Sequence, residues 1–429
     1  MTVTDDTKVG SSRPAKVAFA SFVGTAIEWY DFFIFGTAAA LVFGVAFFPT
    51  LSPLSGTLAA FATFGVAFVS RPAGAIVFGH FGDRIGRKKM LVFSLLLMGS
   101  ATVMIGLIPT YDQIGVAAPI LLVLARLLQG FAVGGEWGGA VLMAVEHAPA
   151  RKRAFYGSFP QAGVPAGLVL ATLAFLIIER LPEEQMMAWG WRIPFLASAG
   201  LLAVGIYVRF KMAESPEFEN VRRNDQIVER PIVNVFKYEK RAFGVGLLTQ
   251  AASLVPFYLV TVFVLSYGPK ELGLSRQTIL LSLLAACVLD IFTVPYASII
   301  ADRVGPRKML IYGSAYMAVI AYPFFWLLQT GSGWAVLLAM FLIVTIGHAV
   351  TYSAVAAYVA SLFPADVRYT GASVAYQGGG VIFSAPAPFI ATALASATEG
   401  QWALAAYIAA ACLVTIAVLS LSATAKVSH

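Results

Sequence analysis

Charge is scarce in this chain of 429 residues. Only 12% of the residues are charged, against about a quarter in a soluble domain, while 59% are hydrophobic and the mean hydropathy is +0.81. This composition excludes a soluble enzyme with a large core and predicts an all-α membrane protein with many transmembrane helices. The net charge of +7 does not indicate nucleic-acid binding, because the basic residues cluster between apolar runs.

Residues suited to catalysis or metal binding are equally sparse. The two cysteines, Cys287 and Cys412, lie within apolar runs and offer no disulfide framework. The four histidines lack metal-ligand spacing, and the sequence holds neither a nucleophile constellation nor a phosphate-binding loop. We therefore expect no enzymatic activity, no cofactor and no metal. No cleavable signal peptide is expected, because the first apolar run is too long for one.

The chain has instead a series of apolar runs, each long enough for a transmembrane helix of about 20 residues. A charged stretch near the middle is expected to be a linker with a short surface helix and no chemistry of its own. The predicted domains are an N-terminal six-helix half (1–210), a cytoplasmic linker (211–241) and a C-terminal six-helix half (242–429). The twelve expected spans are residues 18–43, 57–81, 89–109, 118–146, 154–178, 192–210, 242–267, 276–301, 308–328, 334–362, 368–395 and 402–423.

Two short motifs occur once in each half. Residues 83–91 read DRIGRKKML and residues 302–310 read DRVGPRKML, an offset of 219 residues, or about half the chain. Pro149, Ala150, Arg153 and Gly157 recur in the same order as Pro364, Ala365, Arg368 and Gly371. Two repeats in one order predict two homologous, pseudo-symmetric halves, which is a known transporter architecture. Glycines in the first motif suit a tight turn between two helices.

Lysine and arginine are distributed unequally between the two sides of the expected spans. With a cytoplasmic N-terminus, 23 of the 29 lie on the cytoplasmic side and 4 on the other, and Arg71 and Arg126 lie within spans. This bias predicts that both termini are cytoplasmic.

These features resemble the major facilitator superfamily, because the loop at 79–89 carries Asp83 and Arg84 at the diagnostic positions of its signature. The stretches at 28–33, 126–139, 190–195, 214–216 and 368–371 resemble the bacterial metabolite:proton symporters. Within that family, the chain is most similar to the shikimate transporters over 57–85, 126–147 and 183–196. The resemblance implies a protein of the bacterial inner membrane. It also implies import of a small organic acid together with protons, by alternating access between the halves.

Ionisable side chains within the spans are the first candidates for function, because each costs about 3 kcal/mol or more in a bilayer. Glu28 and Asp31 lie one turn apart on one face, where desolvation and mutual repulsion favour a shared proton. We predict proton coupling at Asp31, Glu28 and Glu136, with a slight preference for Asp31. The alternative, strongest for Glu136, is that opposite charges simply neutralise one another and hold the helices together.

The substrate carboxylate is expected to bind Arg126 or Arg71, which can each donate two parallel hydrogen bonds. Arg71 could also neutralise Glu28 or Glu136. Asp290 occupies the position equivalent to Arg71 in the second half, and its partner stays open. Further side chains expected in a central cavity, with packing or a structural histidine as the alternative, are Tyr30, Gln129, Trp137, Gln250, Tyr258, His348 and Tyr352.

The repeated loop is predicted to close the cytoplasmic side. Asp83 would do this through charge-assisted hydrogen bonds and without touching substrate. The other gating candidates are Arg84, Gly86, Arg87, Asp302 and Arg303.

The sequence therefore predicts a proton-coupled importer of a shikimate-like organic acid. The partners expected are that substrate, protons and the lipid bilayer. The alternatives are a carrier of another metabolite, namely a dicarboxylate, an aromatic acid or a betaine, or a transporter-like membrane sensor.

Overall fold

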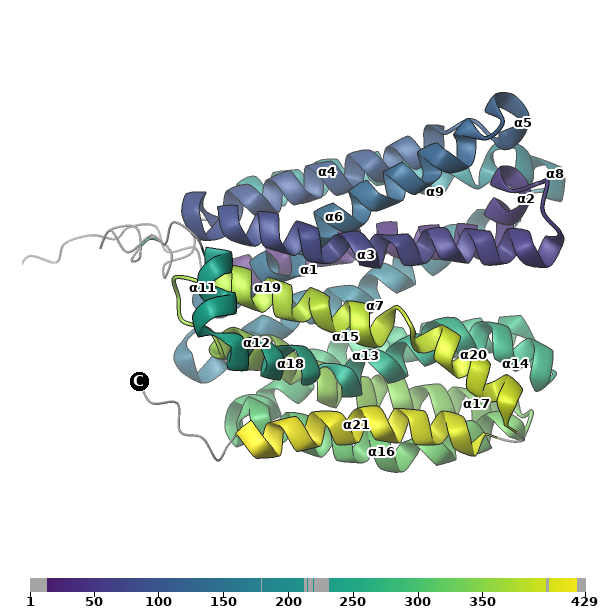
Figure 1. Cartoon of the computed structure of the whole chain (residues 1–429). Helices are drawn as coiled ribbons and strands as arrows, with labels where there is room; N and C mark the ends of the chain where they lie inside the picture. Colours follow the sequence, from purple (N-terminus) through teal and green to yellow (C-terminus); the bar gives the residue numbers. More distant parts are fainter. Residues whose placement is uncertain are drawn as a thin grey trace, which may run out of the picture.

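The computed structural model describes residues 14–178, 180–211, 214, 219, 231–398 and 401–422. These residues form two bundles of roughly parallel long helices, one lying beside the other (Figure 1). Twelve helical segments in the described part of the chain are long and apolar enough to cross a membrane, as predicted.

The first bundle consists of six long helices joined by short connections. Small helices α2 (Gly44–Phe47), α5 (Tyr111–Ile114) and α8 (Glu183–Gln185) lie in the connections at one end of this bundle. The six long helices are α1 (Pro14–Ala38), α3 (Pro53–Ile85), α4 (Arg87–Leu107), α6 (Ala117–Glu146), α7 (Arg153–Ile178) and α9 (Arg192–Phe210).

The second bundle contains three continuous long helices and three that change winding along their length. The continuous ones are α15 (Arg276–Val304), α16 (Pro306–Gln329) and α21 (Trp402–Ser422). The others each contain a wider π-helical stretch, a feature common at functional sites. They are α12 (Lys240–Leu248), α13 (Ala251–Tyr258), η4 (Leu259–Phe263) and α14 (Val264–Glu271); α17 (Gly333–Met340), η5 (Phe341–His348) and α18 (Ala349–Ser361); and α19 (Arg368–Gly379), η6 (Gly380–Ser384) and α20 (Ala387–Ala397).

The stretch between the bundles is described only in part. Its short helix, α11 (Pro231–Tyr238), lies inside the predicted linker, at the end of the molecule where α3 ends and α19 begins (Figure 1). Between 212 and 230 only Glu214 and Glu219 are described. The Glu214 carboxylate accepts hydrogen bonds from the backbone amides of Arg87 (3.1 Å) and Lys88 (3.2 Å), and so caps the start of α4.

The repeated motif forms the same tight turn in each bundle. Gly86 joins α3 to α4 with a φ of 117°, and Gly305 joins α15 to α16 with a φ of 93°. Residues with a Cβ rarely adopt such angles, which explains the glycine in both copies. We call the end of the molecule that carries these turns the Gly86 end.

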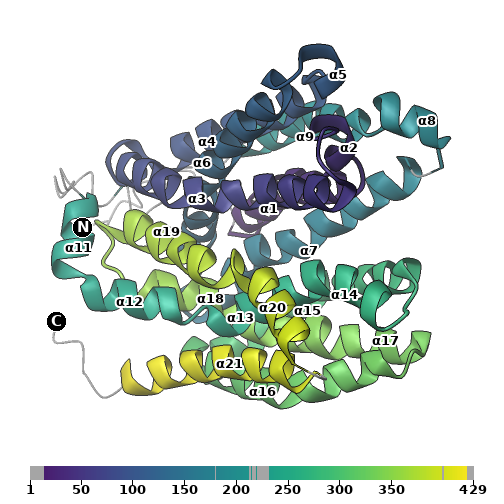
Figure 2. The same cartoon turned by 45° about the vertical axis from the view of Figure 1, so that its right-hand side comes forward.

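The halves pack most closely through α3 with α19 and α7 with α15, which lie side by side in Figure 2. Small residues on α6 permit this close packing. A Cβ on Gly134 would collide with the backbone of Arg71 in α3, and one on Gly138 would collide with Ser373 in α19. The glycine pair therefore lets α6 contact a helix of its own half and a helix of the other half.

Candidate functional site

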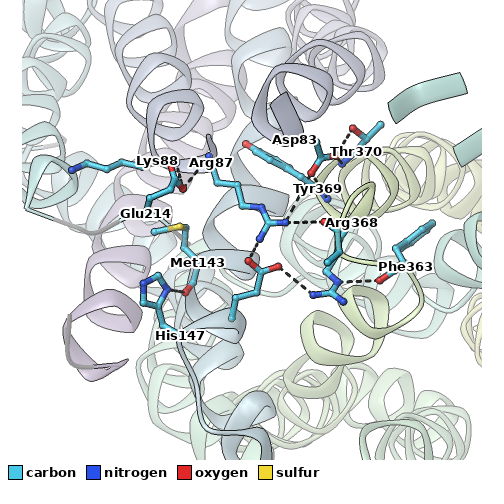
Figure 3. Close-up of polar contacts among 12 residues, drawn as sticks. Asp83, Arg87, Lys88, Met143, His147, Glu214, Phe363, Arg368, Tyr369 and Thr370 are labelled. Atoms are coloured by element: carbon cyan, nitrogen blue, oxygen red, sulfur yellow. Dashed lines mark hydrogen bonds and ion pairs between the residues drawn. The ribbon is translucent and has the colours of Figure 1, made fainter. Parts of the chain in front are cut away.

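Asp83 connects the two halves at the Gly86 end. Its buried carboxylate accepts hydrogen bonds from the backbone amides of Tyr369 (3.3 Å) and Thr370 (2.9 Å) and from the Thr370 hydroxyl (2.8 Å; Figure 3). These residues are in the first turn of α19, where backbone amides have no partner within the helix. A carboxylate from one half therefore caps a helix of the other and meets the positive end of its dipole.

Asp302 makes the reciprocal contact. It lies at the end of α15, and its carboxylate accepts hydrogen bonds from the amides of Ala154 (2.8 Å) and Phe155 (2.9 Å) at the start of α7. Each half thus caps one helix of the other half, using the same residue of the repeated motif.

Arginine side chains also connect the two halves at the Gly86 end. Arg87 pairs with Glu146 and donates to the Ala365 carbonyl oxygen at 3.2 Å, and Arg368 donates to Glu146 at 3.3 Å (Figure 3). Arg84 and Arg303 are exposed, and Arg84 approaches His80 of its own helix. Of the predicted gating residues, Asp83, Arg87 and Asp302 therefore contact the other half, whereas Gly86 shapes the turn.

Glu136 has a different partner from the predicted one. It is buried and pairs with both terminal nitrogens of Arg209 in α9, and it accepts a hydrogen bond from Ser94 at 2.8 Å. Of the two acids that Arg71 could neutralise, Glu136 pairs with Arg209 instead, and Arg209 joins Arg71 and Arg126 as an arginine within the spans. Arg209 lies in the last turn of α9, but helix side chains tilt toward the N-terminus, so it reaches back into the bundle. Its guanidinium lies directly against Gly24 of α1.

Asp31 ends a chain of buried hydrogen bonds that begins at Arg126. Arg126 donates to Gln129 (2.8 Å), and the Gln129 amide donates to the hydroxyl of Thr102 (2.6 Å). Thr102 can donate to the Asp31 carboxylate (2.8 Å), which also accepts from Ser198 at 2.5 Å. Two hydroxyls rather than a cation therefore solvate this carboxylate.

Arg71 and Arg126 both lie over the ring of Phe32, with their guanidinium carbons 4.7 and 4.9 Å from its centroid. Within the described parts of the chain neither forms a salt bridge. Nε and Nη2 of Arg126, and Nε of Arg71, are buried without a hydrogen-bond partner. Two uncompensated cations with free donors make this a place where an anion would be stabilised. Glu28 is also buried, and its Oε2 has no hydrogen-bond partner.

A small cavity of about 10 Å³ lies between the halves, with room for about one water molecule. Three of the predicted residues line it, namely Tyr258, His348 and Tyr352. The remaining lining residues are Trp29, Val164, Ser253, Leu254, Phe257 and Tyr376. Tyr258 also contacts the ring of Phe68, on which Arg71 stacks, so the cavity adjoins the arginines.

Trp137 joins the halves beside this cavity. Its ring stacks on Tyr376 of α19 with centroids 3.7 Å apart, and its indole nitrogen donates to Gln161 at 2.8 Å. The Gln161 amide donates in turn to the Tyr352 carbonyl oxygen at 3.2 Å, and the hydroxyls of Tyr352 and Tyr376 are 2.7 Å apart. Sequence reasoning missed Gln161 and Tyr376, because only their helix phase distinguishes them from packing residues.

Two predicted cavity residues lie elsewhere. The Tyr30 hydroxyl donates to the Pro194 carbonyl oxygen at 2.8 Å, within the first half. The Gln250 amide donates to the carbonyl oxygens of Gly246 (3.0 Å) and Ala375 (3.1 Å), so it fastens two helices of the second half together.

Comparison with known proteins identifies the family. The family model described as Major Facilitator Superfamily matches residues 17–385. The chain belongs to this superfamily. It is 41% identical to the shikimate transporter of Escherichia coli K12, over 96% of this chain and 95% of that protein. It is 44% identical to the inner membrane metabolite transport protein YhjE of the same organism, over 95% and 93%.

More distant matches agree with the fold. The solved structure of the proton:xylose symporter XylE, bound to a bromodeoxyglucose, superposes with a TM-score of 0.72 at 18% identity, over 96% of this chain and 95% of that one. The glycine betaine/proline/ectoine/pipecolic acid transporter OusA of Dickeya dadantii is 33% identical over 97% of this chain and 84% of that protein. The chain is a multi-pass inner-membrane transporter of the major facilitator superfamily, of the metabolite type.

Replacing Asp83 by Asn should slow transport far more than it weakens binding. The substitution removes the charge that caps α19, and a hydrogen bond to a charged group contributes about 1.5–3 kcal/mol, so we expect roughly a tenfold lower rate. Initial uptake in proteoliposomes and equilibrium binding in detergent would be compared at matched protein amounts. Asp112→Asn, at an exposed aspartate of α5, is the control. A folded Asp83→Asn protein that loses binding as severely as transport would contradict a gating role.

Replacing Glu136 by Gln should destabilise the fold, because it removes the carboxylate that pairs with the buried guanidinium of Arg209. Breaking one side of a buried pair costs about 3–5 kcal/mol, whereas replacing both sides is often neutral. The double variant Glu136→Gln/Arg209→Met should therefore recover most of the thermal stability lost by the single variant, measured in detergent. A fully stable Glu136→Gln protein that has lost pH-driven accumulation would instead favour a role of Glu136 in proton coupling.

Proposed function

We propose that this transporter is a proton symporter that imports a small organic acid by alternating access. The observation that carries the proposal is the buried chain from Arg126 through Gln129 and Thr102 to Asp31, which joins an unpaired cation to an unpaired acid. The proposed moving units are residues 1–210 and 242–429, joined by 211–241. Both termini and the Gly86 end are proposed to face the cytoplasm, because lysine and arginine concentrate on that side.

The substrate class follows from the free donors of Arg126 and Arg71. A planar guanidinium binds a carboxylate through two parallel hydrogen bonds, and water is excluded from this site. The tyrosines and His348 around the adjoining cavity can bind hydroxyl groups. A hydroxylated monocarboxylate such as shikimate suits both features, and the similarity to a shikimate transporter supports it. A dicarboxylate, an aromatic acid or a betaine also carries the required carboxylate.

Coupling follows from charge compensation. In the empty carrier, Arg126 favours the ionised form of Asp31 through the oriented dipoles of Gln129 and Thr102. A substrate carboxylate on Arg126 cancels that charge, so the protonated form of Asp31 becomes more favourable. By linkage, a proton on Asp31 strengthens substrate binding to the same extent. Glu28, buried one turn away, is the alternative carrier.

The anion site is tested by replacing each arginine with Gln. Loss of a charged hydrogen bond should weaken carboxylate binding about tenfold or more in at least one variant. The measurement is equilibrium binding of shikimate, succinate, benzoate and glycine betaine at matched protein amounts, which also ranks the substrate classes. Arg84→Gln, an exposed arginine, serves as the control. Unchanged affinity for every compound in both variants would remove the anion site.

The coupling residue is tested by separating exchange from accumulation. Asp31→Asn should still exchange labelled for unlabelled substrate across proteoliposome membranes. The asparagine amide is always neutral, like a protonated Asp31, so substrate can bind and the carrier can alternate without a proton being taken up or released. It should fail to accumulate substrate when the outside is made acidic. Glu28→Gln is measured alongside to assign the proton to one acid. Uphill accumulation by both variants would show that the proton travels by another route.

A further inference from the structure

The second half contains a buried acid–imidazole pair at the cavity. Asp290 of α15 is fully buried, and its Oδ2 lies 2.8 Å from Nδ1 of His348, at the end of η5. The imidazole is held between the rings of Phe257 and Tyr352, with centroids 4.8 and 4.7 Å away. Thr345 fixes the same π-helical stretch to α15 by donating to the Ala286 carbonyl oxygen at 3.0 Å.

This geometry leaves one ring nitrogen for the cavity. An ionised Asp290 holds a proton on Nδ1 of His348, and His348 lines the cavity. In the described parts of the chain, no hydrogen-bond partner is found for Nε2. This nitrogen accepts a hydrogen bond when the ring is neutral and donates one when the ring is protonated.

Within the described residues no cation forms a salt bridge with the pair, and Arg71 lies beyond Tyr258 and Phe68. The titratable groups facing it are Asp290 and Cys287 from α15, Tyr258 from α13 and Tyr352 from α18, and Tyr316 of α16 donates to the backbone of η5. α17 has no titratable residue. The pair is therefore neutral when His348 carries a second proton and carries a charge of −1 when it does not. A carboxylate substrate close by is repelled by the second state.

We propose that the Asp290–His348 pair is a second proton site, which binds its proton together with an anionic substrate and donates a hydrogen bond to that substrate through Nε2. This proposal rests on the organic-acid function proposed above. It places one proton in each half, one at Asp31 and one at His348. The second proton removes the negative charge of the pair, so binding through His348 depends on pH independently of Asp31.

The first test is the pH dependence of binding to purified protein in detergent. All proteins compared carry the Asp31→Asn substitution, which removes the first proton site. The probe is whichever of shikimate, succinate, benzoate and glycine betaine binds the Asp31→Asn variant most tightly. Affinity should fall about tenfold per pH unit once His348 loses its proton, because one proton is bound with the substrate. His348→Gln, and the isosteric pair Asp290→Asn/His348→Gln if the single variant unfolds, should abolish this slope. An unchanged slope in a folded variant would overturn the proposal.

His147→Gln is the matched control, because this histidine lies outside the spans at the Gly86 end, where its Nδ1 donates to the Met143 carbonyl oxygen (2.8 Å). Burial lowers the pKa of His147, so its replacement should leave the slope unchanged. A second measurement needs no ligand. In the nitrogen-15 spectrum of histidine-labelled protein, the signal that disappears in His348→Gln should change from the neutral to the doubly protonated form as the pH is lowered. A signal that stays neutral throughout would overturn the proposal.

The results distinguish this proposal from the general function. If Arg126→Gln and Arg71→Gln leave affinity unchanged while the His348 slope persists, the arginine anion site fails and the second proton site stands. If the arginine variants weaken binding while His348→Gln keeps the slope, the organic-acid function stands and the second proton site fails.

Discussion

A charge within a lipid bilayer has no water to solvate it, so each ionisable side chain in the spans depends on a partner supplied by the protein. Most of the buried charges here have one. Glu136 has Arg209, Glu146 has Arg87 and Arg368, and Asp83 has the amides that begin α19. Within the described residues, Arg71, Arg126, Glu28 and Asp31 form no salt bridge. A buried charge without a counter-charge is energetically unfavourable. Binding of an anionic substrate or a proton would balance these charges, as a carrier of charged substrates requires.

The two halves share a backbone plan but differ in how they handle charge. The equivalent position holds Arg71 in the first half and Asp290 in the second, and Asp290 finds its partner in its own half. All three interrupted helices of the second half line the cavity, whereas in the first half α7 runs without a π-helical stretch and α1 continues into one, η1 (Ala39–Phe43). The repeat thus preserves the two glycine turns, whereas the charged side chains differ between the halves where they face each other.

The fold was largely predictable because it depends on the lengths of the apolar runs and on repeated glycines, which can be read from the sequence. Run length gave the twelve spans, and the repeated glycine gave the two turns, since no other residue adopts those angles without strain. The site was only partly predictable, because side-chain partners depend on helix rotation. Tyr30 and Tyr258 both looked like cavity residues, yet Tyr30 faces α9 and Tyr258 faces the cavity. Arg209 was missed because its reach along the helix, and not its position in the sequence, puts it inside the bundle.

The reciprocal caps at the Gly86 end have a kinetic consequence. Asp83 holds the start of α19 and Asp302 holds the start of α7, so parting the halves strips both helices of their amide partners in the same event. Neither contact can open while the other stays closed, because both bridge the same two rigid bundles. The movement should therefore behave as a single cooperative step with one barrier, and a half-open intermediate should not accumulate.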